Sequence, residues 1–191
     1  MVRRIGAAAF LFLILVIFTG CAAWQYIGRP DTPWKNAGFD ATLPTGWVKC
    51  NLSNQLLSLT KDGMLLEEIS ITRHNLNSDK EFPLSKKRIK DDMLIQEIAD
   101  LVVGEMSLDK AEVFNLSVLE NKPVNIGGMD GFRLEYTFNN GDFTKYKVIF
   151  YGFIFNKKFY DIRYTAASQH YFEANLKDFE EFVASFKVII K

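Results

Sequence analysis

Short reversals between apolar segments constrain this chain more than any other feature of its sequence. Asp62-Gly63, Asn140-Gly141-Asp142 and Asn156-Lys157-Lys158 each separate two apolar or aromatic segments. Reversals this short join antiparallel strands, because a parallel pair needs a crossover connection of about a dozen residues or more. The chain therefore predicts an antiparallel sheet rather than repeated strand–helix–strand units.

The segments that flank the reversals supply the expected strands. Residues 39–43 alternate apolar and polar side chains, as a half-buried strand does, and Pro44-Thr45-Gly46 turns the chain into a second strand from Trp47. The other expected strands cover residues 56–60, 65–73, 114–119, 131–138, 145–155 and 159–165.

Helical periodicity appears twice. Near the C-terminus, apolar residues recur at spacings of four and three; they are Phe172, Leu176, Phe179, Val183 and Phe186. A middle helix is expected between residues 85 and 107, with its regular part beginning near Ile89, because the basic residues before it would oppose the helix dipole. The order of strands, helix, strands and helix predicts an α+β fold, an antiparallel β-sheet flanked by helices.

The N-terminal residues have the three parts of an export signal. Arg3 and Arg4 precede an unbroken apolar run over residues 7–18, and Thr19-Gly20-Cys21 follows it. The run has about a dozen residues, whereas a spanning helix needs about 20. We therefore expect a signal peptide that is removed after export.

The end of this run, Phe18-Thr19-Gly20-Cys21, resembles the lipobox of bacterial lipoproteins, although Phe18 stands where Leu, Val or Ile is usual. The resemblance implies a diacylglycerol on Cys21, cleavage before Cys21 and anchoring by two or three acyl chains. Ala22, which is not the aspartate of inner-membrane lipoproteins, favours the outer membrane, facing the periplasm. The alternatives are an ordinary secretory signal cleaved near Ala22-Ala23, or an uncleaved signal anchor.

The chain is thus expected to have three parts. Residues 1–20 form the lipoprotein signal peptide, residues 21–36 a lipidated cysteine and tether, and residues 37–191 a single domain. The tether is expected because glycine and prolines interrupt any periodic pattern there.

The domain resembles the PsbP/Mog1-like family. The resemblance rests on Leu43-Pro44-Thr45-Gly46-Trp47 at its start, Gly127-Gly128-Met129-Asp130-Gly131 leading into a strand, and Ser185-Phe186-Lys187 at the end of the last helix. It implies an α/β/α sandwich around an antiparallel sheet. Members of this family include a photosystem extrinsic subunit, a nuclear-transport GTPase cofactor and many bacterial lipoproteins. The resemblance implies docking to a larger assembly without chemistry, and fold alone does not settle function.

Charge and cysteine content exclude some classes of protein. The chain has 23 basic and 23 acidic residues, and removing the signal peptide takes away Arg3 and Arg4. That balance gives no basis for binding nucleic acid. With Cys21 lipidated, only Cys50 remains, so no disulfide within the domain is expected. Cys50 is either a half-buried strand residue or the partner in an intermolecular disulfide.

The sequence offers no catalytic constellation. It has no Gly-x-Ser-x-Gly motif, and Cys50 has only His74 and His170 as possible bases. Two distant histidines do not make a zinc site, and the oxygen-bearing residues near Asp142 fit a hairpin turn as well as a calcium site. We therefore expect no enzyme activity, no catalytic residues, no metal and no cofactor.

Two surface features are candidates for contact with a membrane or a partner protein. Lys86, Lys87, Arg88 and Lys90 form a basic cluster that either contacts an anionic membrane or a partner, or is a solvated loop. The aromatics after Phe132 either fill a core covered on both faces or expose a patch to a partner.

Together these observations predict a membrane-anchored lipoprotein that acts as a non-catalytic interaction or assembly module in the cell envelope. Its expected partners are the membrane, through lipid on Cys21, and an envelope protein. The alternative is a small-ligand or metal-binding envelope lipoprotein, which predicts a deep pocket with a few converging polar groups.

Overall fold

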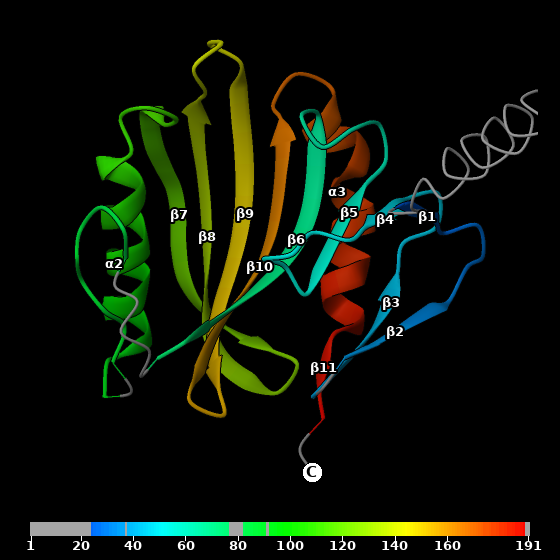
Figure 1. Ribbon diagram of the computed structural model, residues 1–191, viewed down its shortest axis with the longest axis horizontal. Coiled ribbons are helices and arrows are strands. Elements are labelled where there is room, and N and C mark those ends of the chain that lie inside the picture. The colour runs from blue at the N-terminus through cyan, green and yellow to red at the C-terminus, as the bar shows by residue number, and fades with distance from the viewer. Residues whose placement is uncertain (1–23, 37, 77–81, 91, 190–191) are drawn as a thin grey trace, which may run out of the picture.

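A computed structural model describes residues 24–36, 38–76, 82–90 and 92–189. The expected signal peptide and Cys21 lie outside these residues. The described chain forms a large antiparallel sheet, a small antiparallel sheet and two long helices (Figure 1).

The large sheet has eight strands in the order β1-β4-β5-β6-β10-β9-β8-β7. Their bounds are β1 Trp24–Tyr26, β4 Val48–Cys50, β5 Leu57–Thr60, β6 Glu67–Asn75, β10 Lys158–Ala167, β9 Lys145–Phe155, β8 Met129–Asn139 and β7 Phe114–Ile126. The small sheet has the order β11-β3-β2, with β11 Lys187–Val188, β3 Phe39–Leu43 and β2 Thr32–Asn36. The helices are α2 Ile95–Leu108 and α3 Tyr171–Ser185.

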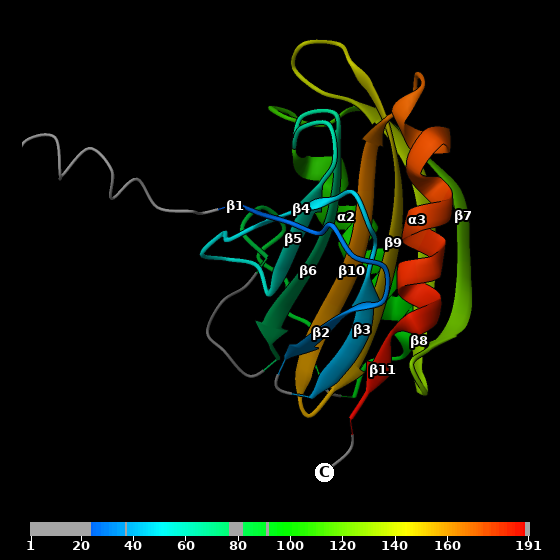
Figure 2. The same cartoon turned by 90° about the vertical axis from the view of Figure 1, so that its right-hand side faces the viewer.

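The large sheet is covered on both faces. Helix α3 and the small sheet pack on one face, and α2 packs on the other (Figures 1 and 2). The predicted α+β fold, an antiparallel sheet flanked by helices, is confirmed. The small sheet beside α3 is an addition that the sequence did not reveal.

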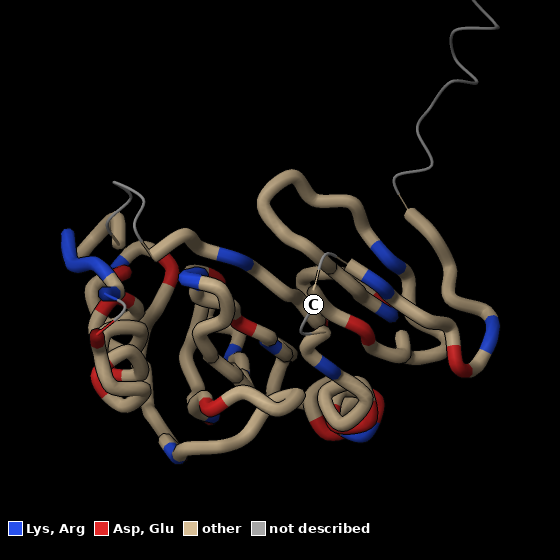
Figure 3. The backbone as a smooth tube through the Cα atoms, turned by 90° about the horizontal axis from the view of Figure 1, so that it is seen from below, with Lys and Arg blue, Asp and Glu red and all other residues tan. Residues whose placement is uncertain are grey.

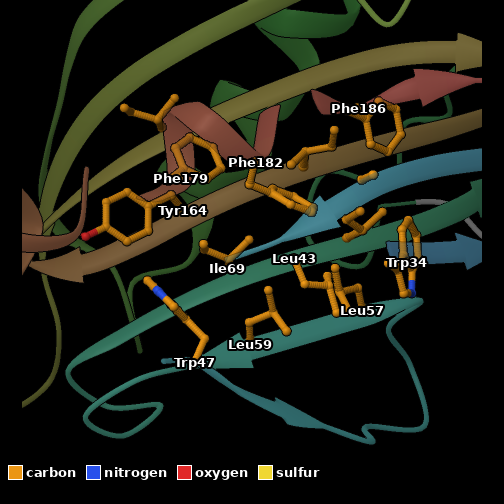
Figure 4. Packing of buried hydrophobic residues seen from close by; sticks show 14 of the residues in the cluster. Trp34, Leu43, Trp47, Leu57, Leu59, Ile69, Tyr164, Phe179, Phe182 and Phe186 are labelled. Atoms are coloured by element: carbon orange, nitrogen blue, oxygen red, sulfur yellow. The ribbon is translucent and has the colours of Figure 1, made fainter. Parts of the chain in front are cut away.

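Strand alternation divides the aromatic side chains between two cores. Tyr164 of β10 points to the α3 face, where its ring stacks on Phe179 and lies near Phe182 of the helix (Figure 4). Phe153 of β9 belongs to the same core. Phe150 of β9 joins the core under α2 instead. The abundance of aromatics after Phe132 therefore serves mainly to fill both sides of one sheet.

Two-residue turns close the longest hairpins. Gly127 and Gly128 join β7 to β8 with φ of 57° and 94°, and Asn156 and Lys157 join β9 to β10 with φ of 49° and 56°. Positive φ at both central residues gives a turn whose twist matches the right-handed twist of the two flanking strands. Strand β7 runs well beyond the expected 114–119. Its Pro123 is tolerated because β7 is the edge strand, where one ladder donor can be missing.

The middle helix begins later than predicted. Helix α2 starts at Ile95 rather than near Ile89, and Leu94, directly before it, is 70% exposed. The backbone N–H of Leu94 donates to the Glu97 carboxylate at 2.8 Å, which fixes the first turn there. The basic residues before it lie in a separate turn.

The expected tether is corrected as well. Residues 24–36 belong to the fold, because β1 pairs with β4 and β2 pairs with β3. Ile27 and Trp34 are 3% and 5% exposed, so this segment supplies core residues. Pro33 does not prevent this, because β2 is an edge strand of the small sheet. The domain therefore includes residues 24–36 and does not begin at residue 37.

Candidate binding cleft

Helix α2 covers only part of its face of the large sheet. Its buried residues Ile98 and Val102 pack in the same core as Phe132 and Leu134 of β8. Beside the helix, residues at the end of β6 and Phe159 of β10 line a hollow together with residues of the segment 82–90, which leads toward α2. A cleft results between this segment and the sheet.

The cleft holds a cavity of about 670 Å³. Its apolar lining comes from residues of both walls: Leu56, Leu76, Phe82, Pro83, Ile89 and Phe159. Its charged lining is Arg73 of β6 with Lys87 and Arg88 of the facing segment, and no Asp or Glu is among the described lining residues. A cavity with an apolar wall and three cations suits an anionic group attached to an apolar body.

Two of the four residues of the predicted basic cluster line this cavity. Lys87 and Arg88 face it, whereas Lys86 and Lys90 are exposed and do not. Ile89, buried between Arg88 and Lys90, fixes the segment against the core. Figure 3 shows the basic run as a blue stretch beside α2.

Glu105 of α2 positions the basic segment. Its carboxylate accepts the backbone N–H groups of Leu84 and Ser85, each at 2.8 Å. Burial would raise the pKa of Glu105, but these bonds and nearby Lys86 outweigh it and lower that pKa. The carboxylate therefore stays ionised and holds the turn that presents Lys87.

A buried carboxylate lies next to the cleft, on β10. Asp161 is 1% exposed and receives the Thr72 hydroxyl hydrogen bond, with Arg163 at 3.4 Å and His74 at 3.6 Å. Register explains the cluster, because Thr72 is directly opposite Asp161 in the β6–β10 pair. Burial would raise the pKa of Asp161, but Arg163, His74 and Thr72 together lower it below its usual range.

The Thr72–His74–Asp161 group does not have the geometry of a catalytic relay. The Thr72 hydroxyl donates to Asp161 Oδ2, and His74 Nε2 approaches that same oxygen as well as the Thr72 hydroxyl, at 3.1 Å. In a relay, the two ring nitrogens separate the nucleophile from the acid. Here the cluster instead holds His74, whose ring stacks on Phe159, at the wall of the cavity.

A second hollow continues on the other side of Pro83. It measures about 470 Å³ and is lined by Tyr136, Phe138, Met106 and Arg163, among others. Arg163 lies over the Phe150 ring at 5.0 Å and so links the floor of this hollow to the buried Asp161.

The remaining candidates lie elsewhere. Cys50 is buried at the end of β4, and burial together with Glu68 raises the pKa of its thiol, as expected for a structural cysteine. His170 is exposed at the start of α3. The side chain of Asn140 accepts backbone N–H groups of its own turn, from Asp142 and Thr144. Among the described residues, no group of three or more His, Cys, Asp or Glu could hold a metal ion.

Sequence reasoning missed Arg73, Asp161, Arg163 and Glu105. The pairing of β6 with β10 places Asp161 and Arg163 on the same face as Thr72, whereas Arg73 lies opposite Tyr160. One signal was available: Asp161, Arg163 and Thr165 put polar side chains at alternate positions of an otherwise apolar strand.

The fold and the cleft define a class: an α+β sandwich with a cleft beside one helix. The PsbP family model matches residues 33–188, and the chain belongs to this family. The implied PsbP/Mog1-like fold is thereby confirmed. No curated protein matches the chain in sequence.

Solved structures of low sequence identity share the fold. The solution structure of cyanobacterial PsbP (CyanoP) from Synechocystis sp. PCC 6803 aligns with a TM-score of 0.58 at 15% identity, covering 89% of this chain and 95% of that one. LpqN of Mycobacterium tuberculosis, described as involved in cell envelope biogenesis, aligns with a TM-score of 0.56 at 12% identity, covering 83% and 90%. A Bacteroides thetaiotaomicron protein aligns with a TM-score of 0.51 at 14% identity, covering 86% of this chain and 50% of that one.

Proposed function

We propose that this chain is a lipid-anchored, non-catalytic binding module of the bacterial cell envelope, held by acyl chains on Cys21. The apolar run that ends at Cys21 supports the anchor. Among the described residues, no helix is long and apolar enough to cross a membrane. The likeness to LpqN, an envelope protein, supports the compartment, and the absence of aspartate after Cys21 supports the outer membrane, facing the periplasm.

The cleft carries the binding part of the proposal. Its two walls are far apart in the sequence, and Glu105 fixes the segment that bears the cations Lys87 and Arg88. A segment that is already held in place suits recognition, because it loses less conformational entropy when a partner binds than a flexible segment would. The partner that fits is an envelope protein with an acidic segment that also carries an apolar side chain for the Phe82 and Phe159 wall.

Crosslinked pull-down from native membranes tests this function. The full-length, lipidated protein should recover a stoichiometric partner, and Cys21→Ser should lose it by removing the anchor. Lys87→Glu with Arg88→Glu should lose the partner while the protein stays in the membrane fraction. Lys86→Glu with Lys90→Glu is the matched control, because it reverses the same number of charges outside the cavity. Equal loss in both double variants would contradict recognition by the cleft.

The cavity supports a second candidate, a small anionic amphiphile as the ligand. Its volume of about 670 Å³ lies within the range of small-molecule sites. A phosphate or carboxylate would meet the cations while a short acyl chain lies against Phe82 and Phe159. Lysophosphatidylglycerol should then raise the melting temperature of the protein, and lysophosphatidylcholine at the same concentration should not. A shift that persists in the Lys87→Glu, Arg88→Glu variant would refute this candidate.

A further inference from the structure

Strand β1 begins three residues after Cys21. Trp24 opens β1, whose residues pair with β4 from Trp24 opposite Cys50 to Tyr26 opposite Val48. An extended chain spans at most about 3.3–3.6 Å per residue, so Trp24 lies within about 11 Å of the cysteine along the chain. Acyl chains on Cys21 would therefore hold β1 itself against the bilayer, with no long linker between them.

Strand β1 presents aromatic side chains at this end of the molecule. It is an edge strand with one neighbour, β4. Trp24 and Tyr26 are 56% and 67% exposed and, two residues apart, lie on one face of the strand. Exposed Trp and Tyr rings are favoured at the headgroup level of a bilayer, where an apolar body and a polar tip are both accommodated.

Basic residues lie near Tyr26. A hollow of about 610 Å³ next to β1 is lined by Tyr26 together with Arg29, Lys35 and Lys49. Asp31 lies in the same segment, and Asp40 is 3.7 Å from Lys35, so the local excess of positive charge is small. Each basic residue near an anionic surface contributes about 1 kcal/mol. The aromatic pair is therefore the main contact, and charge adds to it.

We infer that the β1 edge is the membrane-facing surface of the protein, with Trp24 and Tyr26 inserted among the lipid headgroups. This inference rests on the proposed anchoring through Cys21. Strand β6, which contributes to the cleft, is three strands from β1 at about 4.8 Å a strand, so this part of the cleft lies about 14 Å from β1 across the sheet.

Tryptophan fluorescence in vesicles tests the inference. The chain has three tryptophans, and Trp34 and Trp47 are 5% and 0% exposed. Full-length lipidated protein is reconstituted in phosphatidylglycerol–phosphatidylcholine vesicles, with and without phosphatidylcholine brominated near the headgroup end of its acyl chains. We expect bromolipid to quench the Trp24 component, and Trp24→Phe to abolish this quenching with the fold unchanged by circular dichroism.

Flotation and mass spectrometry of the same samples separate the possible failures. Protein that is acylated on Cys21 and floats with the vesicles, but shows no quenching, would overturn the inference and leave the anchoring intact. Protein without acylation that does not float would overturn both. A Trp24 emission shift that depends on protein concentration, without bromine quenching, would show a second copy of the chain on β1 and would also overturn the inference.

Discussion

Replacing the buried carboxylate of β10 is the most informative single substitution for this fold. Asp161→Asn keeps the size of the side chain and an acceptor for the Thr72 hydroxyl, but removes the charge that faces Arg163. Removing one partner of a fully buried ion pair costs about 3–5 kcal/mol. The Arg163 side chain is 39% exposed, so water compensates part of this loss, and we expect a cost of about 2 kcal/mol at pH 7.

Urea unfolding of residues 22–191, which contain every described residue, measures this difference. A loss of about 2 kcal/mol corresponds to a melting temperature lower by about 4–8 °C for a chain of this size. Because folding lowers the pKa of Asp161, its contribution is complete above the unfolded-state pKa of about 3.9 and disappears as pH falls through the folded-state pKa. The difference between the two proteins should therefore be constant from pH 5 to 7 and shrink below about pH 4.

Arg163→Met in the Asp161→Asn background supplies the control. It removes the other charge, and the double variant should recover part of the lost stability. The argument is refuted if Asp161→Asn is as stable as the unchanged protein at pH 7, or if the stability difference does not depend on pH.

Further predictions concern the core under α3, the central strand β9 and helix α2. Phe179→Ala should lower the free energy of unfolding by about 3–5 kcal/mol, because this ring is fully buried in the α3 core; denaturant titration checks it, and a loss below 1 kcal/mol would contradict the packing. Gly152→Ala should cost about 2–3 kcal/mol, because the added methyl group would lie 2.4 Å from the Phe132 ring in the middle of the sheet. Gly104→Ala, in α2 with nothing within 4 Å of the added methyl group, should instead stabilise by about 0.5–1 kcal/mol; equal effects of the two glycine substitutions on the melting temperature would be inconsistent with these environments.

Several strands and the last helix could be predicted from the sequence, because the spacing of apolar residues along the chain shows which side of each element is buried. The alternation in residues 39–43 and the apolar stripe of the last helix report burial on one side, and both elements are found. Phe182 does not belong to the predicted apolar stripe, whose residues are spaced by four and three, yet it is buried. The small sheet packs beside α3 and covers this additional side of the helix. Segment 24–36 looked irregular, and its strands exist because β3 and β4 pair with them.

The cleft was only half visible in the sequence. Lys86, Lys87, Arg88 and Lys90 stood out as a cluster, but which of them faces a cavity depends on Ile89 and on the contact with Glu105. Neither the burial of Ile89 nor that contact follows from spacing along the chain. Arg73 joins the cluster only through tertiary structure, and Asp161 acquires its lowered pKa from residues that lie opposite it across a strand pair.

The small sheet ties the two ends of the domain together. Strand β11, at the end of the chain, pairs with β3, and Thr42 donates its backbone N–H to Ser185, 143 residues away. Phe39 stacks on Phe186 with ring centroids 5.2 Å apart. Strand β3 pairs with β2 early in the chain, but its other edge has no partner until the last residues have been synthesised. A chain built in this way completes its fold only when its C-terminal residues are present, so a chain that ended before Phe186 would leave Phe39 and one edge of β3 uncovered.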